Sequence, residues 1–243
     1  MKPLRKHFTI VSLLACALLL GWRPATAANT VTIDGAFADW ADEYCKADPG
    51  ACDDFPNQQD TKGACIASNF TATMPSPATT VYLRFDFDVV GLSGANTADA
   101  CWLIDTDSDG NTNAAICMEL TGNPFNAITN PYFTCNDSAP ACGGPVSGSP
   151  ASLNCAFTNS LAAAQQLECS GGDTGDAAIE CSISTADLGV SANNVVTLIS
   201  GCTFGSPQPN SATHDCATEG GPFVIDLDDG GNSPVELIDL SVN

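Results

Sequence analysis

Alternation of apolar and polar positions is the clearest pattern along the chain. Residues 79–90, TTVYLRFDFDVV, place Val81, Leu83 and Phe85 on one side of an extended segment and mostly polar residues on the other. This period of two predicts a β-strand with one buried face. Residues 100–105, ACWLID, are apolar on both faces, as is typical of a central strand.

Similar segments recur along the chain, and the connections between them are rich in Gly, Pro, Ser and Asn. The further segments that we expect to form strands are 30–35, 64–73, 114–120, 177–183, 194–204, 222–228 and 234–242. Many short strands with turn residues between them favour layers of antiparallel sheet. The pattern therefore predicts an all-β fold, an antiparallel β-sandwich.

The beginning of the chain has a different character. A positively charged start precedes a mostly apolar run over 8–22, and residues 25–27, ATA, give the small-x-small pattern that signal peptidase cleaves. We expect residues 1–27 to be a signal peptide and residues 28–243 to form a single domain, with an elaborated loop region at 136–175. No later apolar run is long enough for a transmembrane segment, so the expected location is secreted or extracellular, including a bacterial cell surface or periplasm.

Charge narrows the choice of partners. After removal of residues 1–27 only Lys46, Lys62 and Arg84 remain as basic residues against 28 acidic ones, which gives 3 − 28 = −25. An acidic surface of this kind repels nucleic acid phosphates and anionic lipids, so nucleic acid is not an expected partner.

Cysteines are frequent and even in number beyond residue 27. Twelve remain, no CxxC pair occurs, and His214 is the only histidine in this part of the chain. In an exported chain this composition predicts disulfides rather than a metal–thiolate site.

Some of the disulfide pairs follow from the expected strands. In a hairpin centred on Asp109, Cys101 directly faces Cys117, and opposed residues are close enough for a disulfide. Two short loops and one longer loop suggest the further pairs Cys45–Cys52, Cys135–Cys142 and Cys202–Cys216. Pattern alone leaves four cysteines unassigned, namely Cys65, Cys155, Cys169 and Cys181.

The turn of that hairpin carries the strongest candidate for chemistry. Residues 103–115, LIDTDSDGNTNAA, match the first half of an EF-hand calcium loop in ligand types and in the position of Gly110, although Ile116 stands where an EF-hand has a bidentate glutamate. We therefore expect a calcium-binding β-hairpin loop, and the alternative is an Asp- and Asn-rich solvated turn. The expected Ca²⁺ ligands are Asp105, Asp107, Asp109, Asn111 and Asn113, with Glu119 or a distant acid completing the shell.

A second acidic turn follows the strand expected at 222–228. Asp226, Asp228 and Asp229 precede two glycines, and a solvated turn is the preferred interpretation there, with a second cation left open.

Motifs for catalysis are lacking in the sequence. There is no G-x-S-x-G elbow, phosphate-binding glycine loop or HExxH motif. Glycoside hydrolysis needs only two positioned carboxylates, so a glycoside-active enzyme is the remaining enzymatic alternative. We expect a protein that is not an enzyme.

Four segments resemble one known family. They are VTIDGAFADW (31–40), TTVYLRFDFD (79–88), CWLIDTDSDGNTNA (101–114) and GDAAIECSISTADLG (175–189). Together they resemble DOMON-like domains related to carbohydrate-binding module family 9. The resemblance implies a secreted, jelly-roll-like β-sandwich that is stabilised by calcium and binds carbohydrate. Sugar-binding members stack aromatic rings on the ligand, whereas Trp40 and Trp102 are expected in the core here.

Two function classes follow. The first is a secreted, calcium-stabilised binding module for carbohydrate or another cell-surface component. The second is a structural or adhesive surface or fibre protein that self-associates. Retention on polysaccharide gels distinguishes the first class, and calcium-dependent polymers without sugar affinity distinguish the second.

Overall fold

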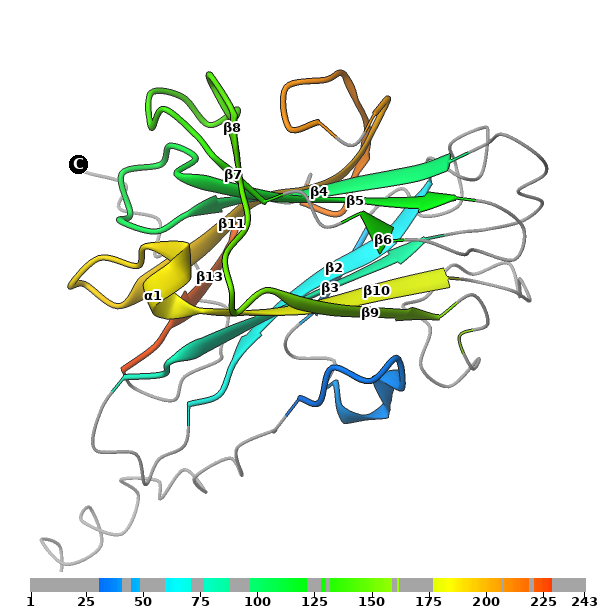
Figure 1. The fold of residues 1–243 in the computed structure, drawn as a ribbon, viewed down its shortest axis with the longest axis horizontal. Coiled ribbons are helices and arrows are strands. Elements are labelled where there is room, and N and C mark those ends of the chain that lie inside the picture. The colour runs from blue at the N-terminus through cyan, green and yellow to red at the C-terminus, as the bar shows by residue number, and fades with distance from the viewer. Residues whose placement is uncertain are drawn as a thin grey trace, which may run out of the picture.

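Two antiparallel sheets packed face to face form the protein, as the computed structural model shows (Figure 1). The structure describes residues 31–40, 45–48, 60–70, 77–87, 97–121, 128–129, 132–158, 161, 177–206, 208–218 and 221–228. The predicted all-β sandwich is confirmed. Residues 1–27, which we expect to be a signal peptide, and the strand expected at 234–242 lie outside the described residues. None of the described helices is long and apolar enough to cross a membrane.

The first sheet, sheet A, has five strands. Their order is β1 (Cys45–Ala47), β2 (Thr61–Ser68), β3 (Thr80–Phe87), β10 (Ala177–Ser184) and β9 (Asn154–Thr158). The second sheet, sheet B, has eight strands. Its main path is β12 (Thr213–Cys216), β11 (Val195–Phe204), β4 (Thr97–Asp105), β5 (Ala114–Thr121), β7 (Tyr132–Thr134) and β8 (Val146–Gly148). Off this path, β13 (Phe223–Asp226) pairs with β11 and β6 (Ile128–Thr129) pairs with β5.

The main core lies between the sheets and follows the predicted alternation. Leu83 and Phe85 of β3 are fully buried and face the other layer. Trp102 of β4 packs edge-on against Phe85, with ring centroids 6.2 Å apart, and donates its Nε1–H to the carbonyl of Arg84 at 3.2 Å. Trp102 is therefore a core residue, as expected from its strand.

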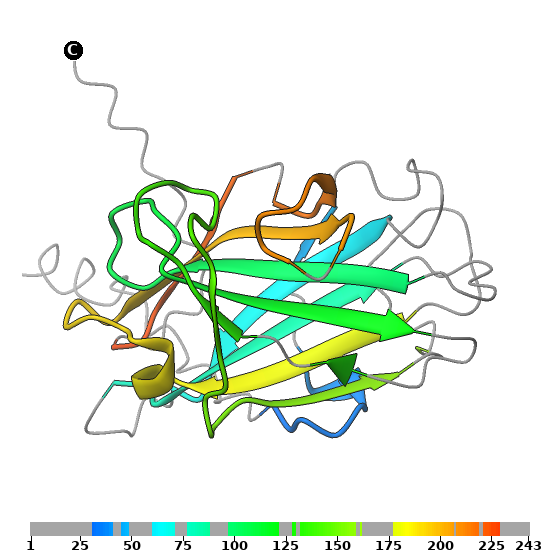
Figure 2. The same ribbon diagram turned by 45° about the horizontal axis from the view of Figure 1, so that its top comes forward.

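The outer face of sheet A is not exposed to solvent as a simple alternating strand would require. Residues 31–40, which include a single turn of 3₁₀ helix (η1, Phe37–Asp39), lie across it as a strap (Figures 1 and 2). Phe37 packs over Arg84, whose guanidinium carbon lies 5.1 Å from the ring centroid. Arg84 is itself paired with the buried Asp86. Both faces of β3 are therefore buried: the apolar face packs against sheet B, and the more polar face lies under the strap.

A single buried carboxylate holds this strap. Glu180 of β10 accepts the backbone N–H groups of Asp34 and Gly35 at Oε1, at 2.8 and 2.7 Å. Its Oε2 accepts Nε1–H of Trp40 at 2.9 Å. Gly35 needs to be glycine because its φ is +80° and a Cβ would lie 3.1 Å from the carbonyl oxygen of Phe157. The strand predicted over 30–35 is therefore wrong for residues 31–35, which form a bend held by Glu180.

The loop region predicted at 136–175 contains more sheet than expected. Both β8 and β9 lie within it, and β9 pairs with β10 along five residues as an edge of sheet A. One short helix, α1 (Thr185–Leu188), follows β10; Ser184 caps its start and Gly189, with φ +78°, ends it. The dispersed Pro and Gly of this region concealed two short strands.

Five disulfides lie among the described residues, and they confirm three of the four predicted pairs. Cys101–Cys117, Cys135–Cys142 and Cys202–Cys216 are joined as expected. The predicted Cys45–Cys52 pair is wrong, because β1 pairs with β2 and places Cys45 directly opposite Cys65, to which it is bonded.

The fifth disulfide involves two of the cysteines that pattern alone left unassigned. β9 and β10 bring Cys155 opposite Cys181, and these two are bonded. Cys52 and Cys169 lie outside the described residues.

Candidate functional site

The acidic turn lies at the tip of the β4–β5 hairpin, as predicted. Ile104 pairs with Ala114, and the N–H of Asn113 donates to the carbonyl of Ile104 at 2.9 Å, so residues 106–113 form the turn that follows the last residue of β4, Asp105. Gly110, at the sixth position of the calcium-loop pattern, has φ +86°. The backbone therefore makes the sharp turn that the glycine indicates.

Asp105 explains how the crowded turn folds. Its side chain is only 2% exposed. Oδ1 accepts the N–H groups of Asp107 and Ser108 at 3.0 and 2.7 Å, and Oδ2 accepts the N–H of Gly110 at 2.9 Å. Three backbone donors thus converge on one carboxylate, which fixes the loop around it.

Asp109 and Asn113 also have structural contacts. Asp109 accepts both the backbone N–H and the Nδ2–H of Asn111, each at 2.8 Å. The Oδ1 of Asn113 accepts the N–H of Thr106 at 2.7 Å. Asn113, which we expected to be a ligand, therefore has its side-chain oxygen turned toward the base of the loop.

Asp107, like Asp109, is an exposed carboxylate of the turn. Partial loss of hydration raises the pKa of Asp107 first, and the negative charge of Asp137 raises it next. The charges of Asp109 and Asp105 raise the pKa further, whereas a backbone hydrogen bond from Asp109 lowers it in part. Oxygens of Asp105, Asp107 and Asp109 all lie within 4.8 Å of one another. Negative charge is therefore concentrated at the turn, and the repulsion between the carboxylates is unfavourable in free energy.

Asp137 was missed by sequence reasoning because it lies far along the chain. The short loop closed by Cys135–Cys142 packs beside the acidic turn, where the backbone N–H of Thr112 donates to the carbonyl of Ala139 at 2.9 Å. Asp137 has φ +51° and is exposed on this loop. Its proximity to Asp107 follows from the β5–β7 pairing, which no local pattern showed.

A third loop, between α1 and β11, supports the turn from the other side. Asn193 donates its Nδ2–H groups to the carbonyl of Asp107 at 3.1 Å and to the hydroxyl of Ser108 at 2.9 Å. The N–H of Ser191 donates to the carbonyl of Thr106 at 2.9 Å. The three loops gather at one end of the sandwich (Figures 1 and 2).

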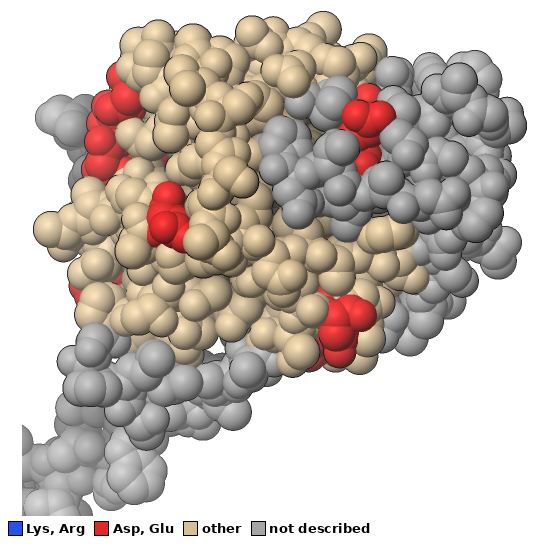
Figure 3. All heavy atoms as spheres, in the orientation of Figure 1, with Lys and Arg blue, Asp and Glu red and all other residues tan. Residues whose placement is uncertain are grey.

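Basic side chains do not neutralise this group. The three basic residues beyond residue 27 are Lys46, Lys62 and Arg84. Lys62 and Arg84 are buried in sheet A. Nζ of Lys46 donates to the carbonyls of Gly221 and Pro222 at 2.9 and 3.1 Å. Among the described residues, no Lys or Arg side chain is visible on the face drawn in Figure 3, whereas acidic side chains are visible there. None of the described basic side chains therefore supplies a counter-charge for the turn.

Glu119 is not part of the site, which corrects our expectation. It pairs with Asp99, six residues before Asp105 along β4. At about 3.4 Å per residue this places it roughly 20 Å from the turn. In a straight hairpin, the distance from the tip increases with each residue along the strand. Glu119 is therefore too far away to be a ligand of a cation bound at the turn.

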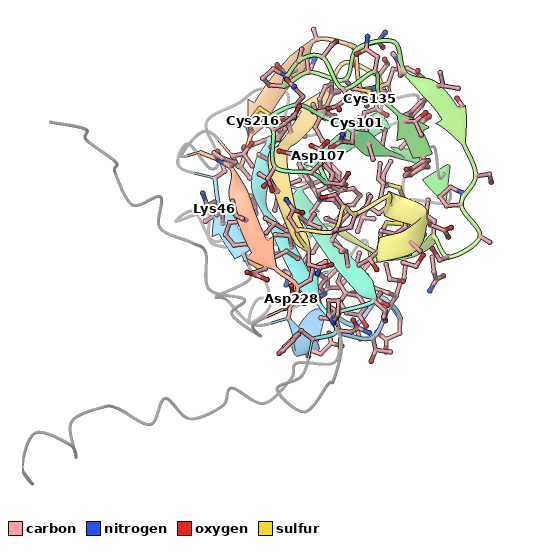
Figure 4. All side chains as sticks on the ribbon, turned by 90° about the vertical axis from the view of Figure 1, so that its left-hand side faces the viewer. Lys46, Cys101, Asp107, Cys135, Cys216 and Asp228 are labelled. Carbon is pink, nitrogen blue, oxygen red and sulfur yellow. A yellow bond between two sulfur atoms is a disulfide. The ribbon has the colours of Figure 1, made fainter. Side chains whose placement is uncertain are left out.

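The second acidic turn lies apart from the first (Figure 4). Asp226 accepts the N–H of Asp228 at 2.8 Å, and Asp228 accepts Nδ2–H of Asn194 at 2.9 Å. Asp229 lies outside the described residues. These contacts are those of a turn that its own side chains hold together.

A further acidic group is buried beside sheet A and was not predicted. Carboxylate oxygens of Asp48, Asp60 and Asp215 lie within 4.8 Å of one another. Asp215 accepts the N–H groups of Thr61 at 2.6 Å and Cys216 at 2.8 Å, so it ties β12 to the start of β2.

No family model, curated protein or solved structure matches this chain. The site therefore has to be interpreted from its own geometry.

Proposed function

We propose that this protein is an extracellular, non-catalytic β-sandwich module that binds Ca²⁺ at the β4–β5 turn. One observation supports this most strongly. Oxygens of Asp105, Asp107 and Asp109 converge within 4.8 Å, while every basic residue beyond residue 27 is engaged elsewhere. A divalent cation relieves this repulsion, and carboxylate and carbonyl oxygens are the ligands that calcium prefers.

Each residue of the turn has a distinct part in this proposal. Asp107 and Asp109 supply exposed carboxylate oxygens, and Asp105 supplies oxygen from a position already fixed by backbone donors. Asn111 supplies its backbone carbonyl, as the seventh residue does in the related loop. Because a bidentate acid at the twelfth position is missing, we expect a Kd of roughly 10⁻⁴ to 10⁻³ M, as in extracellular modules.

Export is supported by the disulfides. Five lie among the described residues, and such bonds persist in oxidising compartments. The signal-peptide pattern at the start of the sequence agrees with this.

The ligand class that we propose is a cell-surface component, with glycan as the first class to test. The resemblance to DOMON-like domains supports glycan. The tryptophans do not supply a stacking platform, since Trp40 is 7% exposed and bonded to Glu180, and Trp102 is fully buried. A glycan would therefore be held by polar groups and calcium in the loops around the turn.

Calorimetric titration tests the metal site. The purified chain, freed of metal, is titrated with CaCl₂ beside Asp107→Asn and a matched control, Glu119→Gln. We expect saturable binding in the wild type and in Glu119→Gln, and at least tenfold weaker binding in Asp107→Asn. Equal affinities in all three chains would remove the turn from the proposal.

A glycan array, read with and without calcium, tests the ligand class. Calcium-dependent retention of wild type that is lost in Asp107→Asn would support glycan binding. Polymers that form with calcium and show no glycan retention would favour the structural or adhesive alternative.

A further inference from the structure

Four cysteines stand in one row across sheet B. The strand registers place Cys216 of β12 opposite Cys202 of β11, Cys202 opposite Cys101 of β4, and Cys101 opposite Cys117 of β5. All four belong to one cluster on the outer face of the sheet. Cys101 and Cys216 both lie in the upper part of the view in Figure 4. The row runs across the strands rather than along one of them.

The two disulfides of the row join its outer neighbours and leave the central pair unbonded. Cys202 is bonded to Cys216, and Cys101 to Cys117, with Cα atoms 4.0 and 4.1 Å apart. These short separations are those of non-hydrogen-bonded pairs. Because the backbone groups of a residue point to one neighbour only, Cys202 and Cys101 form the other kind of pair, with Cα atoms about 5.5 Å apart. That separation lies within the range that a disulfide spans.

Exposure to solvent decreases along the row of cysteines from one end to the other. Cys216 is partly exposed, whereas Cys202 is 2% exposed and Cys101 and Cys117 are fully buried. The Oγ of Ser200 lies 2.7 Å from Sγ of Cys202. A hydroxyl at this distance can donate to a thiolate on Cys202 and so favours its departure from Cys216.

We propose that the row is a thiol–disulfide relay that enters at Cys216 and ends at Cys117. A small external thiolate attacks Sγ of Cys216, forms a mixed disulfide with it and releases Cys202 as a thiolate. The Cys202 thiolate attacks Sγ of Cys101, so a Cys202–Cys101 bond forms while the Cys101–Cys117 bond breaks. The Cys117 thiolate is buried in the oxidised protein, and it takes a proton from water that reaches it once the stem of the hairpin opens. The external thiol is consumed in the mixed disulfide, and the number of disulfides in the system is unchanged.

The relay moves a covalent link from one side of β4 to the other. Before exchange, Cys101–Cys117 closes the stem of the β4–β5 hairpin, and afterwards Cys101–Cys202 joins β4 to β11. The stem below the acidic turn is thereby released. The relay itself rests on strand register and exposure, so it stands independently of calcium binding.

The variant Cys216→Ser tests the exchange without any reductant, because it leaves Cys202 as a thiol beside an intact neighbour. The folded chain is quenched in acid, denatured, alkylated with N-ethylmaleimide and mapped by peptide mass spectrometry. We expect the label to divide between Cys202 and Cys117, with a Cys101–Cys202 linked peptide present. Label confined to Cys202, with Cys101–Cys117 intact, overturns the relay.

A matched control is Cys142→Ser, which leaves the thiol of Cys135. Its backbone pairs with Asn113 rather than with a cysteine, so we expect the label to stay on Cys135. Label that also spreads through this control would show unspecific scrambling and would overturn a relay specific to the row.

Wild-type protein provides a second measurement if Cys216→Ser does not fold. Native chain is treated with glutathione and then mapped in the same way. Glutathione on Cys216 together with label on Cys117 supports the relay. Label on Cys202, or a row that stays fully oxidised, overturns it.

Discussion

Asp107 and Asp187 are both exposed aspartates, yet their pKa values shift in opposite directions. The hydroxyl and the backbone N–H of Ser152 donate to Asp187, at 2.5 and 3.1 Å, and lower its pKa. Asp107 instead faces three other carboxylates, and its pKa is raised. The comparison teaches that exposure alone does not decide the role of an aspartate. An aspartate with hydrogen-bond donors around it acts as a structural acceptor, whereas one that faces other carboxylates favours the binding of a cation.

Glu180, like Asp187, is a carboxylate that accepts hydrogen bonds, but it is buried. Its removal should lower the free energy of unfolding the most. Glu180→Ala leaves the N–H groups of Asp34 and Gly35 and the indole N–H of Trp40 without their acceptor. Hydrogen bonds to a charged group contribute about 1.5–3 kcal/mol each and are not additive, so we expect a loss of roughly 3–5 kcal/mol. Urea unfolding at neutral pH measures it.

Glu180→Gln sharpens the interpretation of that loss. The amide keeps one oxygen for the two backbone donors but turns an NH₂ group toward Trp40, so the loss should be clearly smaller than for alanine. Equal losses in the two variants would mean that packing, rather than the hydrogen bonds, holds the strap.

Substitution of Asp105 should have the next largest effect on stability. This residue accepts backbone hydrogen bonds and is also an expected calcium ligand. Asp105→Ala removes the acceptor of three backbone N–H groups in the turn. We expect about 1–2 kcal/mol of destabilisation in EDTA, since these groups are partly solvated, and loss of calcium binding as well. Urea unfolding in EDTA checks the first effect. An unchanged unfolding midpoint would show that the turn does not depend on Asp105.

The features that the sequence could predict are those that depend on local patterns. The alternation of β3 and the EF-hand-like spacing of the turn are local patterns, and both are confirmed as a strand and a sharp turn at the hairpin tip. The Cys101–Cys117 pair follows from the same hairpin geometry. Calcium itself stays a prediction.

What the sequence could not predict depends on long-range pairing. The proximity of Asp137 to Asp107 requires the β5–β7 register, and the Cys45–Cys65 bond requires that β1 pairs with β2. Glu119 was assigned to the turn because it is close in sequence, whereas an antiparallel ladder separates it from the tip. Local spacing predicts contacts within a turn and not contacts between strands.

Asp187 should give the smallest effect, and its sign depends on pH. Because the folded pKa is lowered, its contribution to stability is present above the unfolded value of about 3.9 and is lost as pH falls through the folded value. Asp187→Asn should therefore be slightly less stable than wild type at pH 7, and the difference should disappear below the folded pKa. Paired urea curves at pH 7 and at successively lower pH values in acid measure this. A difference that grows in acid would contradict it.

Thermal unfolding with and without calcium tests the central claim most directly. Wild type, Asp107→Asn and Glu119→Gln are each melted in EDTA and in excess CaCl₂. At a calcium concentration a hundredfold above Kd, linkage adds about 2.7 kcal/mol, so the melting temperatures of wild type and Glu119→Gln should rise by several degrees. Asp107→Asn should match or slightly exceed wild type in EDTA, because the repulsion is relieved, and should gain little from calcium. Wild-type curves that superimpose in EDTA and calcium would contradict the account and leave the turn as a solvated one.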